Sequence, residues 1–135
     1  MLQNKIVVHY LDGRILKGYT VDFLPTKPTF DLTPADAPQP VTPVEVRFVD
    51  LKAVFFVKNL AGSPQLRTRR QEFDPGQPVP GRKIQVTFKD KEILVGTTQG
   101  YDFKRQGFFV FPADTESNNE RIFILKGATQ QVSFI

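Results

Sequence analysis

The feature that most constrains this chain is an internal repeat. Residues 5–57 align with residues 83–135 without a gap, so that DGRILKG at 12–18 falls on DKEILVG at 90–96. Further identities in this alignment are Lys5/Lys83, Ile6/Ile84, Val8/Val86, Thr20/Thr98, Phe30/Phe108, Pro34-Ala35-Asp36/Pro112-Ala113-Asp114, Val54/Val132 and Phe56/Phe134. A gapless match over a whole unit indicates duplication. Whatever one unit folds into, the chain must therefore hold two copies of it.

Each unit has the pattern of short β-strands. KIVVHYL at 5–11 and KIQVTFK at 83–89 alternate apolar and polar residues, as a strand with one buried face does. Asp12-Gly13 is a hairpin turn signal, and a glycine within the next strand, Gly18, indicates a bend or bulge. The remaining strand-like segments are PTFDLT, VEVRFVD and AVFFV in the first unit and GFFVFP, RIFILKG and QVSFI in the second. No segment has a helical period.

Short, bent strands in such small units are typical of closed barrels, which leave no sheet edge bare. The sequence therefore predicts an all-β chain of two tandem five-stranded small barrels produced by duplication. The first barrel is expected at residues 1–57 and the second at 83–135, with a Pro/Gly/Arg-rich linker at 58–82 between them.

Several classes of site have no basis in this composition. The chain has no cysteine, which excludes disulfides and thiolate metal sites. His9 is the only histidine, and no catalytic triad, His-rich metal spacing or Gly-rich phosphate loop is present. The first residues lack the apolar run of a signal peptide or membrane span. We expect a cytoplasmic protein that is not an enzyme and has no cofactor, metal or membrane contact.

The charge of the chain is concentrated in one place. The net charge is +4, and the segment 58–82 holds Lys58, Arg67, Arg69, Arg70 and Arg82 against Glu72 and Asp74. A basic segment can contact phosphates, and Arg67, Arg69 and Arg70 are the candidates for this role. The alternative is a solvated tether between the two units.

Two motifs resemble the Sm-like family, whose SH3-type small barrels assemble into RNA-binding rings. Residues 12–18, Asp-Gly-Arg-Ile-Leu-Lys-Gly, match the first motif of that family, and Ile124-Leu125-Lys126-Gly127 is similar to the second. The chain departs from the family at Val49-Asp50-Leu51-Lys52, where the second motif is missing from the first unit, and at Lys91-Glu92, which replaces Gly-Arg. The stretch 100–124 also resembles an uncharacterised bacterial domain family.

The Sm-like resemblance implies an RNA site in the loops of the second unit. Aromatic and basic side chains there suit base stacking and phosphate contact. These candidates are Lys104, Arg105, Phe108, Lys126 and Gly127. A separate candidate is the polar loop that contains Ser117, Asn118, Asn119 and Arg121, although such residues are also ordinary hairpin-loop chemistry.

The two units differ most on one face, which we expect the first and last strands of each barrel to form. Val7, His9, Leu11 and Phe55 on this face of the first unit are replaced by Gln85, Thr87, Lys89 and Ser133 in the second. Because monomers seldom leave apolar patches in water, this face is expected to pack against the second barrel or another chain. The leading functional prediction is a non-catalytic binding or scaffolding module that binds a protein, or itself, through this face and the barrel edges. The alternative is an Sm-like RNA-binding protein.

Overall fold

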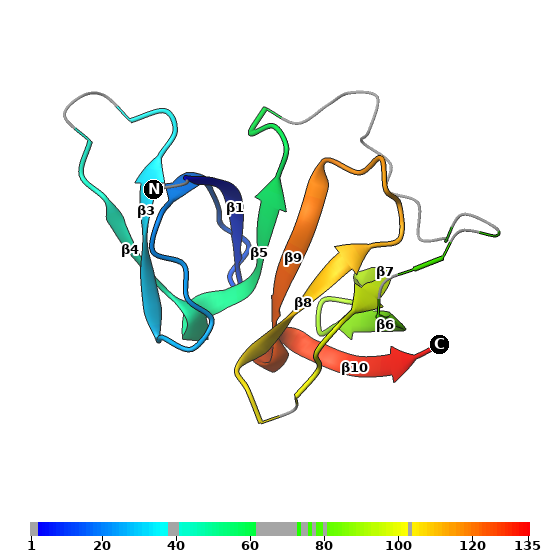
Figure 1. Ribbon diagram of the computed structural model, residues 1–135. Helices are drawn as coiled ribbons and strands as arrows, with labels where there is room; N and C mark the ends of the chain where they lie inside the picture. The colour runs from blue at the N-terminus through cyan, green and yellow to red at the C-terminus, as the bar shows by residue number, and fades with distance from the viewer. Residues whose placement is uncertain are drawn as a thin grey trace.

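The computed structural model describes residues 3–37, 41–61, 73, 76, 78–79, 81–102 and 104–135. Within these residues the chain forms ten β-strands and two 3-10 helices, so the all-β prediction is confirmed (Figure 1). The elements are β1 (Asn4–Tyr10), β2 (Ile15–Thr20), β3 (Thr29–Pro34), β4 (Val44–Arg47), η1 (Phe48–Asp50), β5 (Leu51–Val57), β6 (Arg82–Phe88), β7 (Ile93–Thr98), β8 (Gly107–Pro112), β9 (Asn119–Leu125), η3 (Lys126–Ala128) and β10 (Thr129–Phe134).

The duplication is visible in the element bounds. The strands β1, β2 and β3 have the same limits as β6, β7 and β8 after the shift that aligns the two repeats, and η1 has the same limits as η3. In each repeat the first strand pairs with the last, β1 with β5 and β6 with β10, and both pairings are antiparallel. The predicted strands are therefore confirmed except at the ends of VEVRFVD and RIFILKG, where residues 48–50 and 126–128 form η1 and η3.

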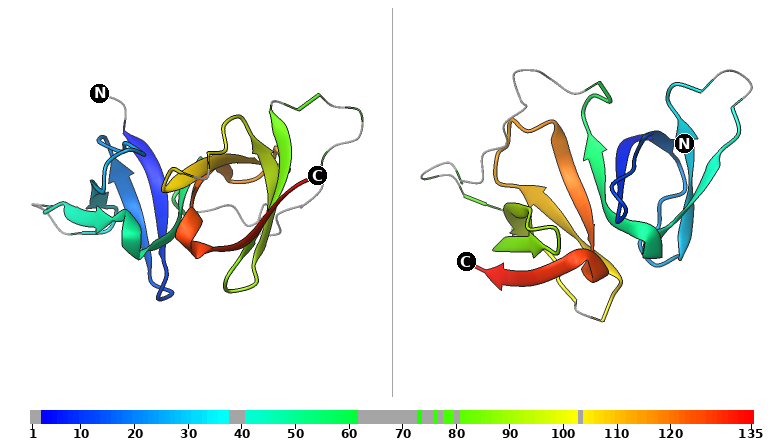
Figure 2. Two further views of the ribbon diagram at one scale, coloured as in Figure 1. Left: turned by 90° about the horizontal axis from the view of Figure 1, so that it is seen from below. Right: turned by 180° about the vertical axis from the view of Figure 1, so that it is seen from behind.

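The predicted arrangement of two separate five-stranded barrels is not what the structure shows, because the strands of both repeats belong to one sheet. The strands form a single open sheet in the order β10-β6-β7-β8-β9-β5-β1-β2-β3-β4 (Figures 1 and 2). The edge of β5 that would close the first barrel pairs instead with β9 of the second repeat, antiparallel, from Ala53↔Ile124 to Val57↔Asn119. As a result, among the described strands β4 pairs only with β3, and β4 and β10 are the two outer strands.

Two apolar clusters lie against this sheet, and each contains side chains from both repeats. The first core includes Ile6, Val8, Phe30, Leu32, Val46, Phe48, Leu51, Val54 and Phe56 of the first repeat, together with Phe123 and Leu125 of the second. The second core includes Ile84, Val86, Phe88, Leu94, Phe108, Val110, Ile122, Ile124 and Ala128 of the second repeat, together with Ala53, Phe55 and Val57 of the first.

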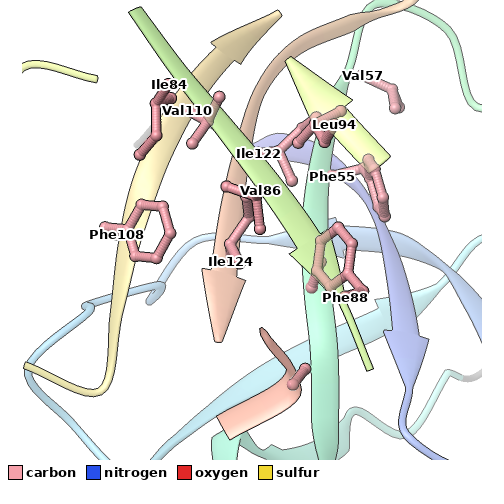
Figure 3. Packing of buried hydrophobic residues seen from close by; sticks show 12 residues of the cluster. Phe55, Val57, Ile84, Val86, Phe88, Leu94, Phe108, Val110, Ile122 and Ile124 are labelled. Atoms are coloured by element: carbon pink, nitrogen blue, oxygen red, sulfur yellow. The ribbon is translucent and has the colours of Figure 1, made fainter. Parts of the chain in front are cut away.

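This sharing follows from strand geometry. Successive side chains of a strand point to opposite faces, so a strand between two cores contributes to both. β5 places Val54 and Phe56 in the first core and Phe55 and Val57 in the second. Figure 3 shows Phe55 and Val57 among side chains of the second repeat. The two repeats therefore share their apolar interior.

The bend that both repeats share requires glycine for a steric reason. A Cβ on Gly18 would lie 2.1 Å from the carbonyl oxygen of Thr33, and one on Gly96 would lie 2.1 Å from that of Phe111. These contacts occur where β2 approaches β3 and where β7 approaches β8. Gly18 and Gly96 thus allow the close backbone approach by which each repeat curves.

A charged contact joins the repeats at the hairpin turn between β6 and β7. Lys52 of β5 donates to Asp90 at 2.7 Å and to the carboxylate of Glu92. Burial opposes the charge on Lys52, but the two hydrogen bonds outweigh it and raise the pKa of its ammonium group. The hydrogen bond from Lys52 lowers the pKa of Asp90. The departure from Gly-Arg at residues 91–92 therefore has a structural role, because Glu92 is a partner of Lys52.

Candidate ligand-binding groove

A groove of about 720 Å³ lies where the β2–β3 connection of the first repeat faces β8 and β9 of the second. Its lining residues are Pro25, Thr26, Lys27, Pro28, Gln99, Gly100, Arg105, Gln106, Gly107, Phe108, Phe109, Phe111, Arg121 and Phe123. The Gln106 side chain connects the two walls by donating Nε2–H bonds to the carbonyl oxygens of Pro25 and Lys27, the latter at 2.9 Å. The β2–β3 and β7–β8 connections can be followed in Figure 1. Both repeats are needed to form this groove.

The lining of the groove is positive and aromatic. The described lining residues include Lys27, Arg105 and Arg121, and none of them is an aspartate or glutamate. Arg105 is exposed and lies 3.8 Å from a carboxylate oxygen of Asp102, which is a long and solvated contact. An anion entering this groove would meet cations and no opposing carboxylate in the lining.

Arg121 is the most constrained of the three cations. The alternation of β9 directs it to the same face as Phe123, toward the first core. Its guanidinium carbon lies 4.3 Å from the ring centre of Phe56 and 5.0 Å from that of Phe109. Stacking of this kind stabilises the guanidinium and restricts its orientation.

Within the described part of the chain, acidic side chains do not use the hydrogen-bonding capacity of Arg121. Among the described residues, no carboxylate is close enough to Arg121 to form an ion pair. A guanidinium has N–H donors in a planar fork that matches phosphate and carboxylate oxygens. Arg121 therefore presents a preoriented guanidinium at the edge of the groove, with donors whose geometry suits an anion.

Arg121 also borders a second, smaller groove of about 220 Å³. Its other lining residues are Gln3, Asn4, Lys5, Phe56, Val57, Lys58 and Glu120. The two lysines bond backbone carbonyls: Lys5 Nζ is 3.4 Å from the oxygen of Lys58, and Lys58 Nζ is 3.3 Å from that of Thr115. Cations thus lie on both sides of Arg121, with one carboxylate, Glu120, among them.

The RNA candidates predicted from the sequence are only partly brought together. Arg105 and Phe108 line the large groove with Arg121. Phe108 is 3% exposed and its side chain packs in the second core, whereas that of its neighbour Phe109 packs against the first core beside Arg121. Lys104 is exposed but does not line either groove, and Lys126 and Gly127 belong to η3, outside both.

Three of the four candidates in the polar stretch, Ser117, Asn118 and Asn119, make structural contacts. The Ser117 side chain is 2% exposed and its Oγ accepts from the Asn119 backbone at 3.0 Å. Asn118 exchanges two hydrogen bonds with Asn59, so it holds the end of β5 against the second repeat. Arg121 is separate from these contacts.

The apolar face predicted for the first repeat divides into two parts. Phe55 is 6% exposed and lies in the second core, and Val7 packs against the same cluster. The half-buried His9 ring has its centre 4.5 Å from that of Phe55. Leu11, in the first hairpin turn, is 56% exposed. Phe55 is therefore covered by the second repeat and is not available to another chain.

Other predicted features can be placed briefly. Arg67, Arg69 and Arg70 lie outside the described residues. The described part of the chain holds no group of three or more His, Cys, Asp or Glu side chains arranged to hold a metal ion. It also contains no helix with the length and apolar character needed to span a bilayer.

The sequence alone did not identify Lys27, Phe109 or Phe56 as parts of the site. The proximity of Phe56 to Arg121 depends on the pairing of β5 with β9, which places the two residues opposite each other, whereas Phe109 lies near Arg121 through the pairing of β8 with β9. One signal was present, because AVFFV at 53–57 is apolar without alternation. Such a run is typical of a strand that is buried on both faces.

Comparison with known proteins gives a family but no activity. The chain belongs to a family of unknown function, DUF6982, which matches residues 2–135. The predicted resemblance to an uncharacterised domain family is confirmed by this match. No curated protein and no solved structure matches the chain.

Proposed function

We propose that this member of DUF6982 is a non-catalytic binding module and that it holds single-stranded RNA in the groove beside Arg121. The observation that carries the proposal is the arrangement of Arg121, which is stacked on Phe56 and Phe109 at the junction of two grooves and has no ion-pair partner among the described carboxylates. RNA binding is the alternative that the Sm-like motifs suggested, and the groove now favours it over a protein partner.

The chemistry of the groove is suited to a nucleotide chain. Lys27, Arg105 and Arg121 supply positive charge for phosphates. The half-buried rings of Phe109 and Phe111 offer apolar surface to bases, which stack on aromatic side chains in many single-strand-binding proteins. The volume of about 720 Å³ is large enough for a nucleotide.

We also propose that each repeat is a variant of the Sm/SH3-like barrel that has been opened at its fifth strand. The pairing of first and last strands in each repeat supports this relationship. The close approach at Gly18 and Gly96 supports it as well. In this view, β9 takes the place that β4 would occupy beside β5.

A protein partner is the competing function, and the structure changes what it would require. The apolar face centred on Phe55 is buried within the chain. A partner would have to bind elsewhere, for example along β4 or β10. No specific feature of those strands favours a protein ligand, so this function is treated as an outcome of the test.

The test is a titration of the full-length protein with a fluorescent, mixed-sequence single-stranded RNA of about 12 nucleotides, long enough for one such site. We expect binding that weakens steeply between about 50 and 200 mM salt. Arg121→Ala should lower affinity about tenfold or more and reduce the salt slope by about one. Arg121→Lys should recover the salt slope but not the full affinity, because lysine cannot stack as a planar guanidinium does.

Lys89→Ala is the matched control, since it removes one positive charge at an exposed turn that lines neither groove. Its affinity for the RNA should equal that of the wild type. The proposal is wrong if the wild type does not bind the RNA, or if Lys89→Ala and Arg121→Ala weaken binding equally. In either case a protein partner becomes the better hypothesis.

A further inference from the structure

The two repeats are joined by the pairing of β5 with β9. The duplication creates a second pair of strands that could pair in the same way between two chains. β5 of the first repeat corresponds to β10 of the second, and β9 of the second corresponds to β4 of the first. The β5–β9 pairing therefore has an unused counterpart, β10 of one chain against β4 of the next. Both of these strands are at the ends of the sheet (Figures 1 and 2). Repeated head-to-tail pairing of this kind generates rings or open filaments.

The buried side chains at the existing junction show what such a pairing needs. β5 contributes Ala53 and Phe55 to the core of the repeat that it joins, and β9 contributes Phe123 and Leu125. All four side chains are at most 6% exposed. The pairing is thus held by apolar residues on both strands as well as by backbone hydrogen bonds.

The outer strands carry polar residues at the four corresponding positions. On β4, Glu45 stands where β9 has Phe123, and Arg47 stands where it has Leu125. On β10, Gln131 and Ser133 stand where β5 has Ala53 and Phe55. Glu45, Arg47 and Gln131 are exposed and Ser133 is half-buried.

A second chain paired in the same register would bury these groups. Glu45 and Arg47 would face the apolar interior that Phe123 and Leu125 fill in the existing junction, and burial of charges without good partners is strongly unfavourable. Pro43 would also stand where β9 has Arg121, and proline has no N–H for a ladder hydrogen bond. Charged and proline residues on an edge strand are known means of preventing edge-to-edge pairing.

We propose that β4 and β10 are end caps, whose polar residues Glu45, Arg47, Gln131 and Ser133 prevent the β5–β9 pairing from being repeated between chains. The head-to-tail pairing of repeats thereby does not continue from one chain to the next. This inference is independent of the RNA proposal, because none of the four residues lines the grooves described above.

The test restores the buried residues at one end at a time and measures mass in solution by light scattering. One variant carries Glu45→Phe with Arg47→Leu, and the other carries Gln131→Ala with Ser133→Phe. The wild type and each variant alone should have the mass of one chain. A mixture of the two variants should form a complex of twice that mass, because it contains one competent end of each kind. The variant with all four changes should form larger, concentration-dependent assemblies.

Register provides the decisive control, and the absence of native cysteine makes it simple. Pro43 and Phe134 correspond to the paired residues Arg121 and Phe56. Pro43→Cys in the first variant and Phe134→Cys in the second should therefore form a disulfide in the mixture, since directly paired strand residues have suitable Cα distances. Lys89→Phe with Asp102→Leu adds apolar surface at two turns that are not part of β4 or β10, and it should leave the protein monomeric.

Three results would overturn the proposal. The wild type could already form assemblies that Glu45→Lys disrupts. The mixture of folded end variants, checked by circular dichroism, could remain monomeric. The mixture could also associate without forming the disulfide between Pro43→Cys and Phe134→Cys, which would indicate non-specific hydrophobic association.

Discussion

The fifth strands of the two repeats, β5 and β10, began as copies and now have opposite environments. β5 is paired on both edges and has five of its seven residues buried in succession. β10 is paired on one edge, and each of its residues is exposed or half-buried. Their sequences, AVFFV and QVSFI, record this difference. A duplicated strand thus keeps its pairing within the repeat while its outward residues adapt to what covers them.

The hairpin turns show the same divergence on a smaller scale. In the described structure Asp12 bonds within its own turn, to the backbone and side chain of Arg14. The backbone hydrogen bond from Arg14 lowers the pKa of Asp12. Asp90, its counterpart, accepts a hydrogen bond from Lys52 of the other repeat. The same turn position is local in one repeat and joins the repeats in the other.

The largest expected effect separates β5 from β10. Phe55→Ala should lower the free energy of unfolding by about 4 kcal/mol, because it leaves a cavity in the second core. Ser133→Ala, at the corresponding position of β10, should change it by less than about 0.5 kcal/mol. Urea unfolding of both variants measures the difference. Equal effects would contradict the different environments of the two strands.

The next effect tests what the repeats still share. Gly18→Ala and Gly96→Ala should each cost on the order of 3 kcal/mol, because the new Cβ would overlap a backbone carbonyl oxygen. Gly127→Ala is the control, since no atom lies within 4 Å of a Cβ at that position. Thermal unfolding of the three variants is sufficient. A small loss in only one of the first two would show that its bend can relax.

A buried hydroxyl gives a third comparison. Thr20 donates to the carbonyl oxygen of Asp31 at 2.8 Å, with a carboxylate oxygen of Asp22 at 3.1 Å. The corresponding hydroxyl of Thr98 is buried without a hydrogen-bond partner in the described structure, and Gly100 replaces Asp22. Thr20→Val should therefore cost about 1.5 kcal/mol, whereas Thr98→Val should be neutral or slightly stabilising. Denaturant unfolding distinguishes the two, and an equal loss would contradict this difference.

The smallest effect concerns the ion pairs of the turns and depends on pH. Lys52→Met should lower the free energy of unfolding by about 1 kcal/mol at pH 7. The loss is this small because Asp90 is exposed and solvent screens the ion pair. Because the folded-state pKa of Asp90 lies below its ordinary value of 3.8, the pair stabilises the protein above that pH and loses this contribution as the pH falls through the folded pKa. The difference between wild type and Lys52→Met should therefore narrow in acid.

Arg14→Met is the matched control for this pH test. It removes the partner of Asp12 from a turn in which both side chains are more than half exposed. The unfolding free energy should change little at any pH. If Arg14→Met lowered the free energy of unfolding as much as Lys52→Met, the contact between the repeats would contribute no more to stability than the local ion pair.

The sequence predicted the strands of each repeat and indicated that the face with Phe55 packs against the second repeat or another chain, but it did not predict which strands pair between the repeats. Alternation along KIVVHYL and KIQVTFK, the Asp-Gly turn and the bend glycines are local signals, and they placed the strands correctly. The β5–β9 pairing depends on contacts far apart in sequence, and the pattern of apolar residues does not specify which strand fills an open edge. The stacking of Arg121 on Phe56 follows from that pairing, so it could not be predicted either.

The central claim is that the two repeats form one cooperative body around shared strands, with the groove between them. Native-state hydrogen exchange tests this directly by measuring the opening free energy of the slowest amides in β1–β5 and in β8–β9. We predict one common value for the two repeats, and we predict that Phe55→Ala lowers both by the same amount. Two distinct values, or a loss confined to the second repeat, would contradict the claim.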